Sequence, residues 1–435
     1  MLSGPGSLRR AHFGPLSAFL ALWLLSGGVS YAADSTPEAA PAAAAPAAAP
    51  PAEAPIDPQV ARGKYLTDAG DCVSCHTRKG GAAFAGGLGF PTPFGTLYSS
   101  NITPDNETGI GKWTAADLRK AMHEGIAPGG KHLFPAFPYT AFTKVTDQDV
   151  EAIFAYLKTL KAETYRPPAN SPAFAMRWPM AIWNALFFKP GRYVPDASKP
   201  AEWNTGAYLV EGLGHCSACH SPRNMFMAEV QERAYAGGAI MDEVAEGKVR
   251  RWSAVNLTSA KGGLAAWTVE HLASYLKTGV SDVAGTFGPM NDVIVNSTSK
   301  LTDDDVKAMA VYLKGLPVQE NQGQPVSGAD VQAGAEIYKK RCDECHGSSG
   351  SGGMFTAPPL AGSAIVQATD PASLLNVILY APKRAEGISY GEWETMKPYA
   401  DVLSDAEIAS VANYIRGSWD NKAPAVKPAD VAAQR

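Results

Sequence analysis

All six cysteines of the chain occur in three short strings that share the spacing Cys-x-x-Cys-His. At this spacing two sulfurs reach both vinyl groups of a haem, and the histidine that follows points at the iron. A zinc site would need a second pair of ligands nearby, and a thioredoxin-like redox pair needs no histidine. The strings therefore predict three covalently attached haem c groups. The attachment residues are Cys72 and Cys75, Cys216 and Cys219, and Cys342 and Cys345.

The iron ligands are expected from the same repeat. His76, His220 and His346 end the three strings and are the predicted proximal ligands. The second axial ligand is expected on a loop before the last helix of each unit, where Met290 and Met396 stand beside glycine or proline. Methionine on such a loop is hard to explain as helix core, and a thioether ligand raises the reduction potential. A proline after each string is expected to present its carbonyl to the imidazole: Pro93, Pro222 and Pro358.

The first unit departs from this pattern. Its loop carries Phe137 where the other two units have methionine, and phenylalanine cannot ligate iron. The candidates for a replacement ligand are Met122, His132, Met176 and Met180. A five-coordinate iron is the further alternative, so the sixth ligand of the first haem stays open.

An internal repeat supplies the elements that must position these residues. A short amphipathic run precedes each haem string, and each unit closes with a helix over 146–160, 302–316 or 404–415. Thr or Ser followed by acidic residues marks the start of each closing helix, and apolar residues then recur at helical spacing. No segment shows convincing strand alternation. The repeat predicts an all-α fold of three tandem class I cytochrome c-like domains.

Composition shifts give the expected boundaries along the chain. The segments are a signal peptide over 1–32, an Ala/Pro-rich linker over 33–56, domains over 57–165, 201–318 and 329–421, an apolar interdomain linker over 166–200, and a tail over 422–435.

The amino terminus and the charge pattern predict a location. Arg9 and Arg10 precede an apolar stretch over 13–25, and small residues then permit cleavage after Ala32, the alternative being an uncut membrane anchor. A net charge of −4 without any block of Lys or Arg argues against nucleic-acid binding. We expect a periplasmic protein at the outer face of the cytoplasmic membrane. The apolar segment 174–188 is too short to span a bilayer, and it either lies in the bilayer interface or packs against protein.

Taken together, these strings resemble the three-haem cytochrome c subunits of membrane-bound periplasmic dehydrogenases. The resemblance covers nearly the whole chain after the linker, and it includes Thr92-Pro93-Phe94-Gly95-Thr96, Asn101-Ile102-Thr103 and Leu403-Ser404-Asp405. It implies electron transfer from a catalytic subunit of the molybdenum, flavin or quinone type, through the haems, to membrane ubiquinone. A loop with Phe137 resembles the cytochromes that serve molybdenum-dependent aldehyde or N-heterocycle dehydrogenases.

The residues alone also favour a chain that carries electrons while another subunit catalyses the reaction. The chain has no Gly-x-Gly-x-x-Gly nucleotide fingerprint and no free cysteine nucleophile. A chain with three redox centres and no evident substrate site is expected to move electrons rather than to catalyse alone. The alternatives are a freestanding multihaem carrier between respiratory complexes, and an enzyme such as a peroxidase that uses an open first haem.

Overall fold

The computed structural model of the chain describes residues 57–435 except 246, 354, 355, 390 and 392. The predicted signal peptide and Ala/Pro-rich linker lie outside the described residues. Pro55–Arg435 forms one compact unit.

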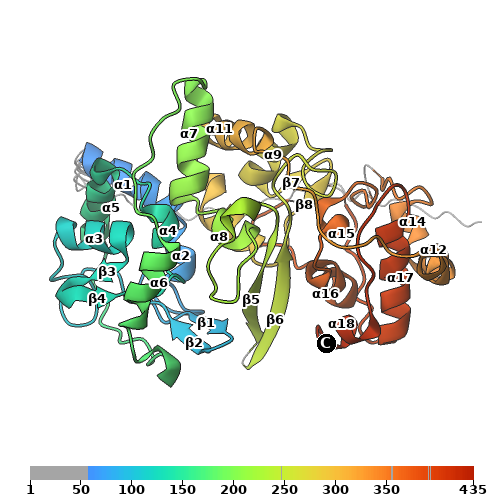
Figure 1. Cartoon of the computed structure of the whole chain (residues 1–435), viewed down its shortest axis with the longest axis horizontal. Helices are drawn as coiled ribbons and strands as arrows, with labels where there is room; N and C mark the ends of the chain where they lie inside the picture. The colour runs from blue at the N-terminus through green and yellow to red at the C-terminus, as the bar shows by residue number, and fades with distance from the viewer. Residues whose placement is uncertain (1–56, 246, 354–355, 390, 392) are drawn as a thin grey trace, which may run out of the picture. The chain divides into compact units, whose positions relative to one another are not determined.

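One pair of packed helices occurs three times along the chain. In each pair the first helix precedes a haem string and the second closes the unit (Figure 1). The pairs are α1 (Pro58–Ala69) with α5 (Asp147–Thr159), α7 (Ala201–Tyr208) with α11 (Asp303–Lys314), and α12 (Gly328–Ala333) with α17 (Asp405–Gly417).

Each pair crosses at a glycine. A β-carbon built on that glycine would lie 1.9 to 2.0 Å from a backbone carbonyl oxygen of the closing helix, so no larger residue fits without moving a helix. The crossings are Gly63 against Ala152, Gly206 against Ala308, and Gly334 against Ser410. The next residues at the crossings are Tyr156, Tyr312 and Tyr414, which therefore occupy matching positions.

The three closing helices begin where the sequence predicts. The side-chain oxygen of the residue before each helix accepts a hydrogen bond from the N–H three residues later, at 3.2 Å for Thr146, 3.2 Å for Thr302 and 3.3 Å for Ser404. Acidic residues in the first turn of each helix complement its dipole.

The other helices carry the haem strings or surround them. The strings lie on α2 (Cys72–Cys75), α8 (Ser217–His220) and α14 (Asp343–His346). The middle helices of the units are α3 (Ala115–Glu124), α9 (Val269–Thr278) and α16 (Ala372–Tyr380). Shorter helices are α4 (Tyr139–Phe142), α6 (Pro179–Phe187), α10 (Met290–Asn296), α13 (Ala335–Arg341), α15 (Ala364–Gln367) and α18 (Pro428–Ala432). A π-helical turn over Leu209–Leu213 continues α7.

Helices dominate the described residues, as the sequence predicts, but the fold is not purely helical. Antiparallel two-stranded hairpins join β1 (Gly89–Thr92) to β2 (Gly95–Tyr98), β3 (Ile126–Ala127) to β4 (Lys131–His132), β5 (Gly238–Ala245) to β6 (Lys248–Ala254), and β7 (Val280–Ser281) to β8 (Ala284–Gly285). The all-α expectation missed them because most are too short to show alternation, and their pairing is local.

The first two units share one apolar core, whereas the third has its own. Leu66 and Ile153 of the first unit belong to the same buried cluster as Leu213 and Leu313 of the second. A separate cluster gathers around α16 and α17. Residues 422–435, predicted as a tail, pack back on α17: Asn413 donates to the carbonyl of Val426 at 3.0 Å, and α18 contacts α17.

The glycine crossings give a direct test of the fold. We expect Gly206→Ala to lower the free energy of unfolding by about 1–3 kcal/mol, because the added methyl group meets the carbonyl of Ala308. Gly191 is the matched control, since a β-carbon there would contact nothing within 4 Å. Gly191→Ala is expected to change stability by less than about 0.5 kcal/mol. Thermal unfolding is measured by circular dichroism. Equal midpoints for Gly206→Ala and Gly191→Ala would show that the two helices are not in close contact at Gly206.

Candidate haem-binding sites

A cavity of about 260 Å³ in the second unit brings together the residues that the sequence assigns to one haem. Cys216, Cys219 and His220 line it together with Met290. The cysteine and histidine side chains belong to the string at α8, and Met290 is the first residue of α10. A cavity between these two elements, with apolar walls and with imidazole and thioether groups on its lining, fits a haem with two axial ligands.

Each histidine predicted as a proximal ligand is oriented by a backbone carbonyl. His76 Nδ1 lies 2.7 Å from the carbonyl oxygen of Ser100, and His220 Nδ1 lies 2.7 Å from that of Val255. In the third unit, His346 Nδ1 lies 3.2 Å from the carbonyl oxygen of Pro358. With the Nδ1 proton held by the carbonyl, Nε2 is left to face a metal. The predicted carbonyl is confirmed at Pro358. It is wrong at Pro93 and Pro222, where Ser100 and Val255 take that place.

Buried asparagines explain the choice of Ser100 and Val255. Asn101 and Asn256 follow these two residues, and each is 2% exposed. Asn101 Nδ2 donates to the carbonyl of Glu163 at 2.7 Å, and Asn256 Nδ2 to that of Gln319 at 2.5 Å. Both amides thus fasten the loop to the chain just after the closing helix. The repeated Asn-x-Thr string was the sequence signal for this loop.

The protonation states suit metal binding. Burial lowers the pKa of His76, His220 and His346, although the bonded carbonyls act in the opposite direction. Neutral imidazole is the form that ligates iron. All six cysteines are free of disulfides. Their sulfurs are therefore available for thioether bonds.

The methionine of the third unit packs against the same apolar cluster as a cysteine of its haem string. Met396 is half-buried and packs, with Cys342 and Tyr399, against the third unit's apolar cluster. The Tyr399 hydroxyl donates to the carbonyl of Arg341, the residue before the string, at 2.7 Å. This bond holds the methionine loop beside the haem string.

Phe137 occupies the structural position of Met290. The helices α3 and α9 both end at a left-handed glycine, whose carbonyl accepts a bond from the loop at 2.7 Å. The loop donors are Leu133 for Gly125 and Thr286 for Gly279. Phe137 lies four residues after Leu133, and Met290 lies four residues after Thr286, so the two residues hold the same position on their loops. The Phe137 ring lies 5.3 Å from that of Phe142 and packs against the shared core.

The four candidates for the sixth ligand of the first haem lie in different surroundings. Met122 is buried on α3, and its counterpart Leu276 on α9 lines the cavity of the second unit. His132 lies on β4, and its carbonyl accepts a bond from Arg177 at 3.0 Å. Met176 is 62% exposed. Met180 packs with Tyr139, Trp183 and Ala228 in a separate cluster.

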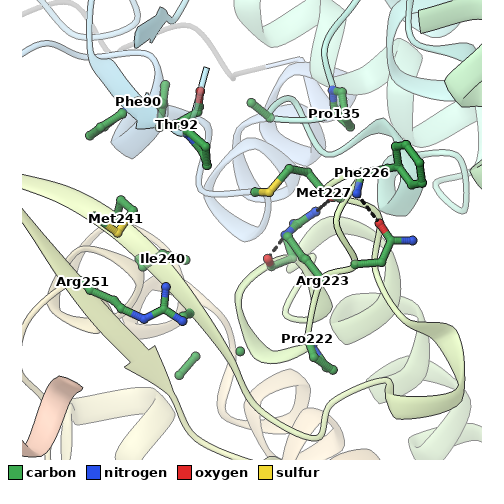
Figure 2. A pocket seen from close by; sticks show the side chains of 18 of the residues that line it. Phe90, Thr92, Pro135, Pro222, Arg223, Phe226, Met227, Ile240, Met241 and Arg251 are labelled. Carbon is green, nitrogen blue, oxygen red and sulfur yellow. Dashed lines mark hydrogen bonds between the residues drawn. The ribbon is translucent and has the colours of Figure 1, made fainter. Parts of the chain in front are cut away.

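A second, larger cavity of about 1040 Å³ is lined mainly by residues of the first two units (Figure 2), and also by Ala368, Thr369 and Asp370 of the third. Phe90, Thr92 and Pro135 come from the first unit, whereas Met227 and Met241 come from the second. Its wall includes Ile240, Ser253 and Ala254, which also line the haem cavity of the second unit. A single layer of residues therefore separates the two cavities. Sequence reasoning missed this cavity because its walls come from distant segments.

The apolar segment 174–188 packs with one face and exposes another. Trp183 is buried, and its Nε1 donates to the carbonyl of Phe226 at 2.9 Å. Tyr139 of the first unit donates through its hydroxyl to Asn184 at 2.6 Å. The segment thus joins the first two units, which is one of the two alternatives that the sequence left open.

Comparison with known proteins gives the class first. Residues 60–161 match the cytochrome c family, and residues 329–415 match subunit III of cbb3-type cytochrome c oxidase. Together with the carbonyl-held histidines, these matches define a c-type cytochrome, which binds haem covalently.

The relatives then define the family. The chain is 38% identical to the gluconate 2-dehydrogenase cytochrome c subunit of Pantoea cypripedii, over 87% of this chain and 90% of the relative. It is 39% identical to the alcohol dehydrogenase (quinone) cytochrome c subunit of Gluconacetobacter polyoxogenes, over 86% of this chain and 84% of the relative. The chain belongs to the family of dehydrogenase cytochrome c subunits, which implies electron transfer from a dehydrogenase.

A further relative is longer than this chain. It is a subunit of the nicotinate dehydrogenase of Pseudomonas putida, and it is 40% identical over 84% of this chain. The chain spans 30% of that protein.

Phe137 gives a test of the loop register. We expect Phe137→Met to place a thioether over the first iron and to raise the reduction potential of that haem by part of the roughly 0.8 V range that axial ligands span. Redox titration with magnetic circular dichroism would detect both changes. Phe94→Met, at a side chain that is 57% exposed, is the control and should leave the potential unchanged. An unaltered first haem in Phe137→Met would contradict the register.

Proposed function

We propose that the chain is the electron-transfer subunit of a periplasmic dehydrogenase, with three haem c groups in three tandem class I cytochrome c-like domains. The observation that carries the proposal is the repeated geometry of the strings, each with an imidazole held through Nδ1 by a carbonyl. Three such sites on one chain form a relay. Electrons from a catalytic subunit of the molybdenum, flavin or quinone type pass along it to membrane ubiquinone.

The proposed ligands follow the strings and the loops. His76, His220 and His346 are the proximal ligands, and Met290 and Met396 are the distal ligands of the second and third irons. The cavity that contains both His220 and Met290 supports this assignment for the second unit. For the third unit the support is that Met396 and Cys342 pack against the same apolar cluster.

The large cavity is the proposed place where ubiquinone accepts electrons. Its lining is mainly apolar, as a lipophilic quinone requires. It shares Ile240, Ser253 and Ala254 with the haem cavity of the second unit, so a bound quinone would lie close to that haem. Arg223 stands in the cavity and donates to the carbonyls of Met227 and Ala218, both at 2.7 Å (Figure 2).

The exposed apolar side chains support docking on a membrane surface. Trp178, Ile182 and Leu186 are 64%, 54% and 69% exposed and recur every four residues, so they form one stripe along α6. Phe94 and Phe226, at 57% and 58% exposed, line the large cavity. Within the described ranges, no helix is long and apolar enough to cross a bilayer. The stripe is therefore proposed to lie in the bilayer interface, where Trp and Phe are favoured.

The proposed methionine ligands make a measurable difference. We expect Met290→Ala and Met396→Ala each to lower the potential of one haem, because loss of the thioether removes a ligand that favours ferrous iron. The expected change is on the order of 0.1 V, a fraction of the roughly 0.8 V that axial ligands span. Spectroelectrochemical titration would measure it. Met225→Ala is the control, since Met225 is 84% exposed. Unchanged titrations in both ligand variants would refute the assignments.

The decisive experiment for the function is purification from host membranes in a mild detergent. We expect a dehydrogenase subunit to co-purify, and the intact mass of the cytochrome chain to exceed that of the polypeptide by three haems. Alcohols, aldehydes, sugar acids and N-heterocycles would then be added while haem absorbance is followed. Substrate-driven haem reduction, and reoxidation by a short-chain ubiquinone, are the expected results.

Each other outcome has a definite meaning. A lone cytochrome that only chemical reductants reduce would replace the proposal with a freestanding carrier. Fewer than three haems in the intact mass would overturn the three-site relay. Carbon monoxide binding at the first haem together with peroxide turnover would instead favour the enzyme alternative.

A further inference from the structure

The contact between the first two haem strings buries an acid. Asp71 immediately precedes Cys72, is 9% exposed, and lines the haem cavity of the second unit. Its carboxylate accepts a hydrogen bond from Ser74 at 2.6 Å. Ser74 in turn accepts one from Asn296 of the second unit at 2.9 Å. A carboxyl group of the first unit is therefore enclosed beside the second unit's haem.

The second unit makes the reciprocal contact. His215 is the counterpart of Asp71, and both residues hold a positive φ, of 37° and 49°. The His215 ring lies 5.4 Å from that of Phe142 in the first unit. Its pKa is lowered by burial, so the imidazole is uncharged at neutral pH. No positive charge from this residue offsets Asp71.

The other charges around Asp71 leave it without a close cation. Asp292 on α10 raises the pKa of Asp71, whereas Lys300 lowers it. Lys300 forms its ion pair with Asp68, at 3.6 Å. Among residues 57–435, apart from the five that are not described, no Lys or Arg is ion-paired with Asp71. Burial is the largest effect and raises the pKa of this carboxyl to about 7.

The haem attachment residues of both units lie near the same carboxyl. Asp71 directly precedes Cys72 of its own unit, and it lines the same cavity as Cys216 and Cys219 of the second unit. A carboxyl group at this point feels the charge of either haem through a medium of low dielectric constant.

We propose that Asp71 is a proton-accepting site coupled to the first two haems, so that their reduction draws a proton onto its carboxylate. This inference rests on the proposed haem relay. In the balanced step one electron converts a ferric iron to ferrous, and one proton from solvent converts the Asp71 carboxylate to the acid. The dehydrogenase supplies the electron. Because one electron and one proton enter together, the net charge of the buried region stays constant. Proton uptake would be a property of this chain in addition to electron transfer.

The sign of the pH dependence follows from the charges. An added electron makes the surroundings of the carboxylate more negative, so the pKa of Asp71 is higher in the reduced protein than in the oxidised one. Below both values the acid is protonated in either state, and reduction takes up no proton. Between the two values, near pH 7, reduction takes up a proton. Above both values the carboxyl is ionised in either state, and reduction again takes up no proton. The potential is therefore flat in acid, falls as the pH rises between the two pKa values, and is flat again above them.

The test is a set of redox titrations of the full chain with all its haems, from about pH 5.5 to about pH 9, a range that brackets the pKa of about 7. In the wild type we expect the ratio of reduced to oxidised haem at the first or second site, at fixed potential, to fall by up to tenfold per pH unit, which is 59 mV for a one-electron couple. Asp71→Asn should remove this slope. Asparagine accepts the same left-handed conformation and can keep the Ser74 bond, so the variant is expected to fold.

Two controls separate this site from general charge effects. Asp282→Asn removes a carboxylate that is 94% exposed and should leave the slope intact. The third haem, identified by Met396→Ala, should show no dependence on Asp71. A redox-induced infrared band of a protonated carboxyl, present in wild type and absent from Asp71→Asn, would support the assignment.

Contrary outcomes are equally clear. A flat wild-type titration, or a slope that survives Asp71→Asn, would overturn the proposal. The intact mass decides separately whether both haems are present, so failure of this inference is distinguishable from failure of the relay.

Discussion

The contact on which the structure most depends is the crossing of each opening helix against its closing helix. With no side chain on Gly63, Gly206 or Gly334, the two backbones approach until a β-carbon would lie within 2.0 Å of a carbonyl oxygen. The haem string follows the opening helix closely in the first unit, and in the other two units after one further helical segment, Leu209–Leu213 or α13. The crossing therefore constrains where the string begins. A tyrosine of the closing helix packs at the same point. The haem site can then form only in the space that the middle helix and the methionine loop enclose.

The sequence predicted the parts of this arrangement that are encoded locally. The Cys-x-x-Cys-His strings indicate haem attachment by themselves. Thr146, Thr302 and Ser404 mark the starts of helices, because each side chain accepts a hydrogen bond from an N–H three residues later. Met290 stands out in the sequence because Gly288 and Pro289 precede it, and its role as an iron ligand stays a prediction; the structure places it at the first position of α10 rather than within a loop. The sequence also placed Phe137 on the loop where the other units have methionine, and the structure adds that the glycine ending the middle helix gives the same register in both units.

The parts that the sequence did not predict depend on contacts between distant segments. The carbonyls of Ser100 and Val255 are chosen by asparagine bonds to residues about sixty positions away, so proximity to a proline was the wrong guide. The hairpins are an exception, since each pairs neighbouring segments; β1 and β2 have only four residues each, which is too few to show alternation. The large cavity has walls from both of the first two units. No single segment of the sequence has a pattern that would predict a cavity whose walls come from several units.

The three units share one helical arrangement, but their candidate haem sites differ in loop residue and in hydrogen bonding. Each unit has the crossing, the string and a carbonyl-held imidazole, but only the second and third have methionine on the loop. The imidazole bond is also longer in the third unit, at 3.2 Å against 2.7 Å in the others. Ligand identity and hydrogen bonding are the terms by which a protein sets haem potential. In the proposed three-haem relay, the differences between the units would separate the potentials while the fold stays the same.

The middle site connects the other two. Its cavity is lined by Asp71 of the first unit and by Ala364 and Ile365 of the third, in addition to its own residues. Ser253 of β6 and Ser373 of α16 exchange backbone-to-hydroxyl bonds at 2.9 and 3.1 Å, which fixes the third unit against the second. In the proposed relay, an electron that travels between the outer sites would pass a haem in this cavity. Asp71, the proposed proton acceptor, lines that cavity, where the charge of its carboxyl would act on the potential of the haem.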